Sequence, residues 1–117
     1  MDRIVLYHNP RWSKSRGAVA LLNEKKISYN LVEYLKEGVS RESVLVLSKK
    51  LNKKPVDFIR KGDLDFKKWA LTNDVLDDFE MAEFIEKYPK VLERPILVNG
   101  EKAIIGRPPE NILKLFN

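Results

Sequence analysis

The stretch RIVLYHNPRWSKSR, residues 3–16, contains the signals that decide the fold. It begins with a mostly apolar run and continues into the pair Asn9-Pro10, a combination typical of a buried strand followed by a turn. Ser13 or Lys14 is the natural start of a helix, because Pro10 lies upstream and serine is a favoured N-cap. Apolar side chains then recur with helical spacing as far as about Lys26, so the stretch predicts a strand, a loop and the start of a helix.

A second strand follows this helix closely. The segment SYNLVEY, residues 28–34, has enough alternation of apolar and polar residues to predict a strand. A strand, a helix and a strand within about 30 residues form a βαβ unit, whose strands pair in parallel through a right-handed crossover.

The rest of the chain predicts helices, a hairpin and a last helix. PILVNGEKAII, residues 95–105, holds two apolar runs joined by Asn99-Gly100, the preferred pair of a type I′ turn. We therefore expect an α/β fold with a small mixed sheet, in a single domain spanning residues 1–117. The remaining predicted helices are 41–51, capped by Ser40; 55–60, opened by Pro55; one that follows Thr72 or Asn73 and ends at Pro89; and one opened by Pro108 or Pro109.

Composition excludes several kinds of chemistry. The chain has no cysteine, which excludes disulfides, thiolate metal sites and thiol redox chemistry by this polypeptide. His8 is the one histidine, so no metal site with several histidines can form, and we expect no bound metal or cofactor. Paired lysines and a net charge of +5 suggest either a solvated surface or an attraction for anions, and we favour the surface.

The same composition bears on location. No apolar run reaches the roughly 20 residues that span a bilayer. The opening MDRIVLYHNP lacks the pattern of a secretory signal. We expect a cytoplasmic protein without a membrane segment.

The loop after the first strand carries His8, Ser15 and Arg16 beside a helix N-terminus. Free backbone N–H groups and the helix dipole make such a terminus favourable for anions. The residues also have simpler explanations. Serines at this place cap helices, and a lone histidine often only forms hydrogen bonds at a strand end.

Three further arginines strengthen the interpretation of an oxyanion site. Arg94 and Arg107 each precede a proline, which biases them toward extended backbone, and Arg60 lies near the end of a predicted helix. A guanidinium held in this way can present two parallel hydrogen bonds to a tetrahedral oxyanion. Arg94-Pro95 is also a candidate cis peptide bond. Spacing alone does not bring the three arginines together, and surface arginines are common.

A resemblance joins these features. YHNPRWSKSR closely resembles the active-site loop of the glutaredoxin-linked arsenate reductases, HNP-x-C-x-x-SR, and FIRKGD, RPI and GRPPE resemble that family's other motifs in order. The resemblance implies a thioredoxin-like fold with a cis-Pro95. We also expect a monomer. It also implies arsenate or a similar oxyanion as substrate, with glutathione and glutaredoxin as reductants. The implied oxyanion-binding residues are Arg16, Arg60, Arg94 and Arg107, and His8 and Ser15 would surround the reactive residue.

The departure from the family pattern falls on the reactive residue itself. Trp12 occupies the position of the nucleophilic cysteine, and an indole N–H is a donor only, without a lone pair for attack. We therefore expect no turnover from the chain as written. Three explanations stay open: a pseudo-enzyme, a UGA codon that encodes selenocysteine but was translated as tryptophan, or a replacement of cysteine.

Trp12 also has three expected placements: it fills the anion pocket, anchors a partner, or covers apolar surface. The partner alternative agrees with another functional class. Spx-type regulators resemble these reductases in fold and bind RNA polymerase. They carry a CxxC pair in the N-terminal loop, whereas residues 9–13 here have none.

Overall fold

The computed structural model describes residues 4–116. Within it the chain divides into two compact units. The first unit combines the N-terminal segment up to Glu37 with the C-terminal segment from Arg94, and the second comprises Gly38–Glu93. The single domain expected from the sequence stays a prediction.

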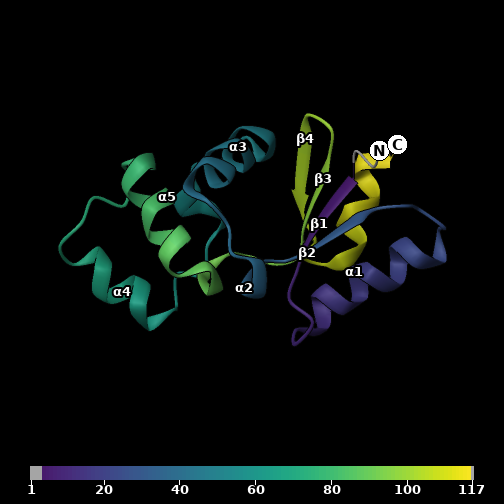
Figure 1. Cartoon of the computed structure of the whole chain (residues 1–117), viewed down its shortest axis with the longest axis horizontal. Helices are drawn as coiled ribbons and strands as arrows, with labels where there is room; N and C mark the ends of the chain where they lie inside the picture. Colours follow the sequence, from purple (N-terminus) through teal and green to yellow (C-terminus); the bar gives the residue numbers. More distant parts are fainter. Residues whose placement is uncertain (1–3, 117) are drawn as a thin grey trace. The chain divides into compact units, whose positions relative to one another are not determined.

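The first unit contains a four-stranded sheet in the order β2-β1-β3-β4 (Figure 1). Its strands are β1 (Ile4–His8), β2 (Asn30–Glu33), β3 (Ile96–Asn99) and β4 (Lys102–Ile105). β1 pairs in parallel with β2, whereas β3 runs antiparallel to both β1 and β4. The predicted βαβ unit and mixed sheet are therefore confirmed. The second strand is shorter than predicted because Tyr34 begins a helical turn, α2 (Tyr34–Glu37).

Two helices, α1 (Ser13–Glu24) and η3 (Pro109–Phe116), lie side by side against the sheet (Figure 1). η3 opens at Pro109 as predicted but is a 3-10 helix. Burial of apolar side chains drives this packing. The fully buried side chains of this core are Leu6, Ala18, Leu22, Leu97 and Ile112.

The connections at the ends of β3 and β4 differ in part from expectation. The Arg94-Pro95 bond is cis, as predicted, and the Arg107-Pro108 bond is cis as well, which we did not predict. Gly106 donates its N–H to the Pro95 carbonyl at 2.8 Å.

The type I′ turn predicted for the hairpin is wrong. Asn99 pairs with Lys102, so Gly100 and Glu101 are the central residues of the turn. Gly100 has a φ of 63°, and a glycine with positive φ in first place is the type II′ pattern. The Asn99 amide donates to the Leu115 carbonyl at 3.0 Å, which holds Asn99 in the strand.

The second unit is helical, and its elements are α3 (Arg41–Leu51), η1 (Pro55–Phe58), α4 (Leu64–Ala70), α5 (Asp78–Lys87) and η2 (Pro89–Val91). Ser40 caps α3 as predicted, since its hydroxyl accepts the Ser43 N–H at 3.1 Å. α3 packs against α5, and Arg41 joins them through ion pairs of 2.8 Å to Glu83 and Glu86.

Two expectations for this unit were wrong, and one helix was missed. The helix opened by Pro55 ends before Arg60, because Ile59 leaves it to form a bridge with Leu92. α4 was not predicted. The helix expected from Thr72 or Asn73 begins only at Asp78, and its cap is Asp77, whose carboxylate accepts the Glu80 N–H at 3.0 Å.

Candidate active site

The loop between β1 and α1 is organised by Asn9, a buried residue that the sequence analysis did not single out. Its N–H donates to the Ser15 hydroxyl at 3.3 Å, and its side-chain oxygen accepts the Arg11 N–H at 3.1 Å. Its carbonyl accepts the Trp12 N–H at 3.1 Å. The Asn-Pro turn signal was the available clue. The hydrogen bonds fix the loop so that residue 12 stands directly before the helix.

Trp12, not Ser13, is the N-cap residue of α1. Its backbone is extended, with φ of −107° and ψ of 131°, and its side chain makes no capping hydrogen bond. The predicted start of the helix at Ser13 is confirmed, but the N-cap is Trp12 and not a serine, since Ser13 is already the first helical residue. The first N–H groups of a helix have no acceptor within it, and the dipole adds positive charge there. The side chain at position 12 thus leaves the chain at the positive end of α1.

Arg94 lies against Trp12. The central carbon of its guanidinium is 3.7 Å from the centroid of a Trp12 ring, a cation–π contact. Arg94 is 5% exposed and Trp12 is 43% exposed. The indole therefore covers a buried cation on one side and meets solvent on the other.

His8 ends β1 and lies opposite Glu33 in the parallel pairing with β2. It is 6% exposed, and within residues 4–116 its Nδ1 has no hydrogen-bond partner. Burial lowers the pKa of His8, and the charge of Arg16 lowers it further, while Glu33 opposes both. The site therefore favours the neutral imidazole.

The other predicted arginines have separate surroundings. The Arg16 side chain donates to the Pro10 carbonyl at 3.0 Å, so it braces the loop. Arg107 is exposed after β4, and its carbonyl accepts the Asn111 amide at 3.0 Å. Arg60 belongs to the second unit, where its N–H donates to the Val91 carbonyl at 2.7 Å. The convergence of Arg60 with Arg94 and Arg107 remains a prediction.

Comparison with known proteins gives the family. The model of the ArsC family matches residues 7–115, nearly the whole chain. The chain belongs to the ArsC family. An arsenate reductase of Haemophilus influenzae is 38% identical over 114 residues, which cover 97% of this chain and 98% of that protein. An arsenate reductase of Neisseria meningitidis serogroup A is 37% identical and covers 96% of this chain and 97% of its own.

The ArsC fold is also evident in a solved structure. An arsenate reductase from Vibrio cholerae superposes with a TM-score of 0.88 at 34% identity, over 95% of each chain. The thioredoxin-like α/β fold expected from the sequence is thus confirmed.

Residues 4–116 contain neither a candidate metal cluster nor a candidate membrane-spanning helix. No cluster of three or more potential metal-ligating His, Cys, Asp or Glu residues occurs among them. Nor does this part of the chain include a helix with the length and apolar character needed to traverse a membrane.

The arrangement around residue 12 can stabilise negative charge. The N-terminus of α1 and the guanidinium of Arg94 both favour an anion at this position. A small ionisable group there would have a lowered pKa for the same reason. An indole has no such group, so in this chain the positive surroundings act only through the face of the ring.

Proposed function

We propose that this ArsC chain has the scaffold of an oxidoreductase for arsenate or a similar oxyanion, with position 12 as the place of the nucleophile. One observation carries the proposal: residue 12 caps α1, and the Arg94 guanidinium lies 3.7 Å from the centre of its side-chain ring. Helix terminus and cation would together lower the pKa of a thiol or selenol at this position. Similarity over nearly full length to proteins named arsenate reductase supports the substrate class.

The proposed roles follow from the chemistry of each residue. Arg94 binds the oxyanion with Arg16, Arg60 and Arg107, and Ser15 and His8 support the nucleophile. A thiolate at position 12 would attack arsenic and displace hydroxide, which leaves as water. Glutathione then attacks the adduct, and glutaredoxin resolves the mixed disulfide. In the overall reaction, two thiols supply two electrons to arsenate. The products are arsenite, one disulfide and water.

With Trp12 in place we expect no turnover, because the ring has no lone pair with which to attack. The gene decides between the three origins of this residue. A UGA codon at position 12, followed by a selenocysteine-insertion hairpin, would make the natural protein a selenoenzyme. A UGG codon would make tryptophan genuine and the protein a pseudo-enzyme, whereas a cysteine codon in the source organism would identify a replacement.

Replacing Trp12 with cysteine tests the scaffold. We expect a folded Trp12→Cys variant with a thiol pKa well below the ordinary value of about 8.5. We also expect it to reduce arsenate with glutathione and glutaredoxin, while the parent chain does not. Thiolate absorbance against pH gives the first result, and arsenite production gives the second.

Two controls make this experiment decisive. In Trp12→Ser the new side chain is similar in size to cysteine but has no thiol, so this variant should stay inactive. Adding Arg94→Lys to the cysteine variant keeps the charge but removes the planar fork, so kcat/KM should fall. An ordinary thiol pKa in Trp12→Cys would contradict activation by the loop. A lowered thiol pKa in Trp12→Cys without arsenite production would support activation of position 12 and would reject arsenate as the substrate.

A regulatory role is the second candidate, because Trp12 is a large apolar residue with 43% of its surface exposed. Tryptophan is enriched where proteins bind one another. A pull-down with purified RNA polymerase subunits tests it: binding that Trp12→Ala abolishes would favour an Spx-like role. Heat from arsenate titration, with protection of Arg60, Arg94 and Arg107 from chemical modification, would favour oxyanion binding instead.

A further inference from the structure

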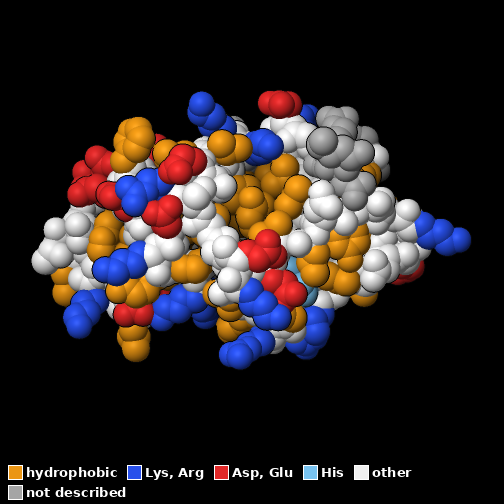
Figure 2. Space-filling view, viewed as in Figure 1, with side chains coloured by type: hydrophobic (Ala, Val, Ile, Leu, Met, Phe, Trp, Pro, Cys, Tyr) orange, Lys and Arg blue, Asp and Glu red, His pale blue; other side chains and the backbone are white. Residues whose placement is uncertain are grey.

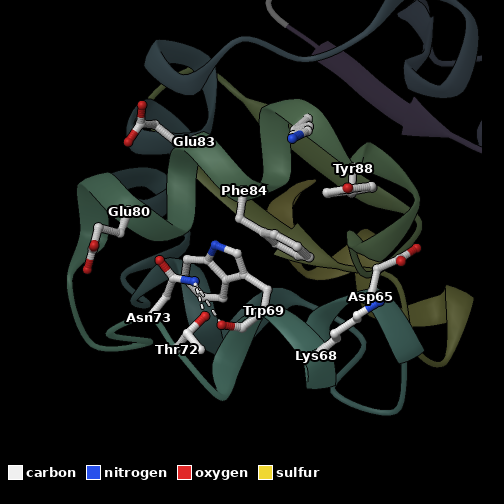
Figure 3. Close-up of a pocket in the computed structure, with 10 residues that line it drawn as sticks. Asp65, Lys68, Trp69, Thr72, Asn73, Glu80, Glu83, Phe84 and Tyr88 are labelled. Carbon is white, nitrogen blue, oxygen red and sulfur yellow. Dashed lines mark hydrogen bonds between the residues drawn. The ribbon is translucent and has the colours of Figure 1, made fainter.

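A pocket of about 520 Å³ lies between α4 and α5 of the second unit, away from residue 12 in sequence and outside the proposed function. Trp69 from α4 and Phe84 from α5 point into it, and Tyr88 lies beside them (Figure 3). Carboxylates stand on both sides, with Glu80 and Glu83 along α5 and Asp65 on α4. Lys68 and Lys87 also line the pocket, and Asp65 pairs with Lys90. Its floor is thus aromatic and its rim is polar.

The rings form a continuous cluster, in which Phe84 is buried and Trp69 and Tyr88 are half-buried. The centroids of Trp69 and Phe84 are 4.9 Å apart, and those of Phe84 and Tyr88 are 5.1 Å apart. The Lys87 ammonium already lies 5.7 Å from the Tyr88 centroid. Ring faces beside carboxylates are good partners for cations, and the chain itself provides one example.

Exposed apolar residues are close in sequence to the residues that line this pocket. Leu71 precedes the lining residue Thr72 and is 84% exposed. Phe79 precedes the lining residue Glu80 and is 71% exposed, and Leu76 between them is 65% exposed. Single exposed leucines are ordinary, but several within one short stretch beside a pocket are typical of an interaction site.

The charge of this stretch identifies the partner's chemistry. Residues 71–83 contain five acidic residues and no basic one, although the whole chain has a net charge of +5. Asp78 pairs with Lys54 and Glu83 with Arg41. Asp74, Asp77 and Glu80 have no ion pair within the described residues. Figure 2 shows acidic side chains over the second unit, with basic side chains among them.

We propose that this surface, formed by the α4–α5 pocket with Leu71, Leu76 and Phe79, docks a basic amphipathic helix of a partner protein. Apolar side chains of the partner cover the exposed leucines and phenylalanine. Its Lys or Arg side chains enter the pocket over Trp69, between the carboxylates. A symmetric pairing with a second copy is disfavoured, because it would place two acidic stretches opposite each other.

Trp69 reports this docking directly. The chain has two tryptophans, so Trp12→Phe leaves Trp69 as the single emitter. The probe is a synthetic peptide of about 14 residues with leucines at helical spacing and lysines elsewhere, long enough to span ~21 Å as a helix. We expect a saturable change in Trp69 emission. In this background, Leu76→Ser, Phe79→Ser and the pair Asp74→Asn with Glu80→Gln should each weaken binding by at least about fivefold.

Matched controls separate docking from general charge attraction. Val46→Ser removes an apolar residue that is 49% exposed on α3, and Glu24→Gln removes a carboxylate from the first unit; neither should change the affinity. Equal binding of the same peptide with glutamates in place of lysines would overturn the proposal. So would equal binding of decalysine, or a Phe79→Ser variant with unchanged affinity. Self-association in sedimentation that Phe79→Ser removes would identify a second copy as the occupant and reject a separate partner.

Discussion

Ser15 shows how a single buried hydroxyl positions the loop before α1. It is fully buried, and its oxygen accepts the Asn9 N–H from the other side of the loop. Ser13, two residues earlier, is exposed at the first helical position. The sequence makes the two serines look equivalent as caps, but only Ser15 joins the ends of the loop.

Replacing the two serines by alanine should therefore have different effects. Ser15→Ala leaves the buried Asn9 N–H without its acceptor, which costs about 1–3 kcal/mol of unfolding free energy. Ser13→Ala is the control and should change it by less than about 0.5 kcal/mol. Urea denaturation followed by circular dichroism measures both. Equal losses would mean that the Asn9 contact does not stabilise the loop.

How much of the site can be predicted from the sequence depends on how far apart in the chain the contacting residues are. His8 at the end of a strand and Trp12 before a helix follow from local signals, namely the apolar run and the Asn-Pro turn. The contact of Trp12 with Arg94 joins residues far apart in the chain, and no periodicity indicates it. The family resemblance suggested their proximity, but the stacked geometry came only from the structure.

At the scale of elements, more than one acidic residue could cap α5. Asp74 and Asp77 can both cap, and Asp77 is the cap used, so the start predicted for α5 was too early. α4 was missed because it is short and buries only Phe66, which gives no periodic apolar pattern. Its one clear signal was Asp63, whose carboxylate accepts the Phe66 N–H at 3.1 Å. The β-hairpin and α3 have strong local signals, and both were found.

Gly106 marks the close approach of β4 to the loop before β3. A Cβ at this position would lie 2.8 Å from Pro95 Cγ and 3.0 Å from Ile112 Cγ2. Gly106→Ala should destabilise the protein by about 1–3 kcal/mol, because both neighbours are packed in the core. Gly62→Ala is a suitable control, since its Cβ would meet nothing within 4 Å. Thermal unfolding compares the two, and an unchanged melting temperature for Gly106→Ala would contradict this close packing.

For the whole molecule, His8 gives stability a specific dependence on pH. Its pKa is lowered in the folded state, mainly by burial, from about 6.5 in the unfolded chain. The unfolded state therefore binds the proton more readily as pH falls. The contribution of neutral His8 to stability is complete above about pH 6.5 and is lost as pH falls toward the folded pKa.

Because His8 is the one histidine of the chain, its titration can be followed alone. Imidazole proton resonances should give a midpoint below about 6.5. The difference in unfolding free energy between the parent chain and His8→Gln should shrink as the pH falls from about 7.5 to about 5.5. A difference that stays constant over this range would show that His8 keeps the same pKa when the chain unfolds.

The order of strands in the sheet also affects folding during synthesis, because one partner of β1 is translated late. β1 is central in the sheet, between β2 and β3, yet residues 34–95 are translated after β2 and before β3. At synthesis rates on the order of 5–20 residues per second, β1 waits several seconds with one edge unpaired. Helices of the second unit emerge during this interval and can form from local contacts. Nascent chains of this protein are thus most open to wrong strand pairing while the second unit is being made, until β3 emerges to close the sheet.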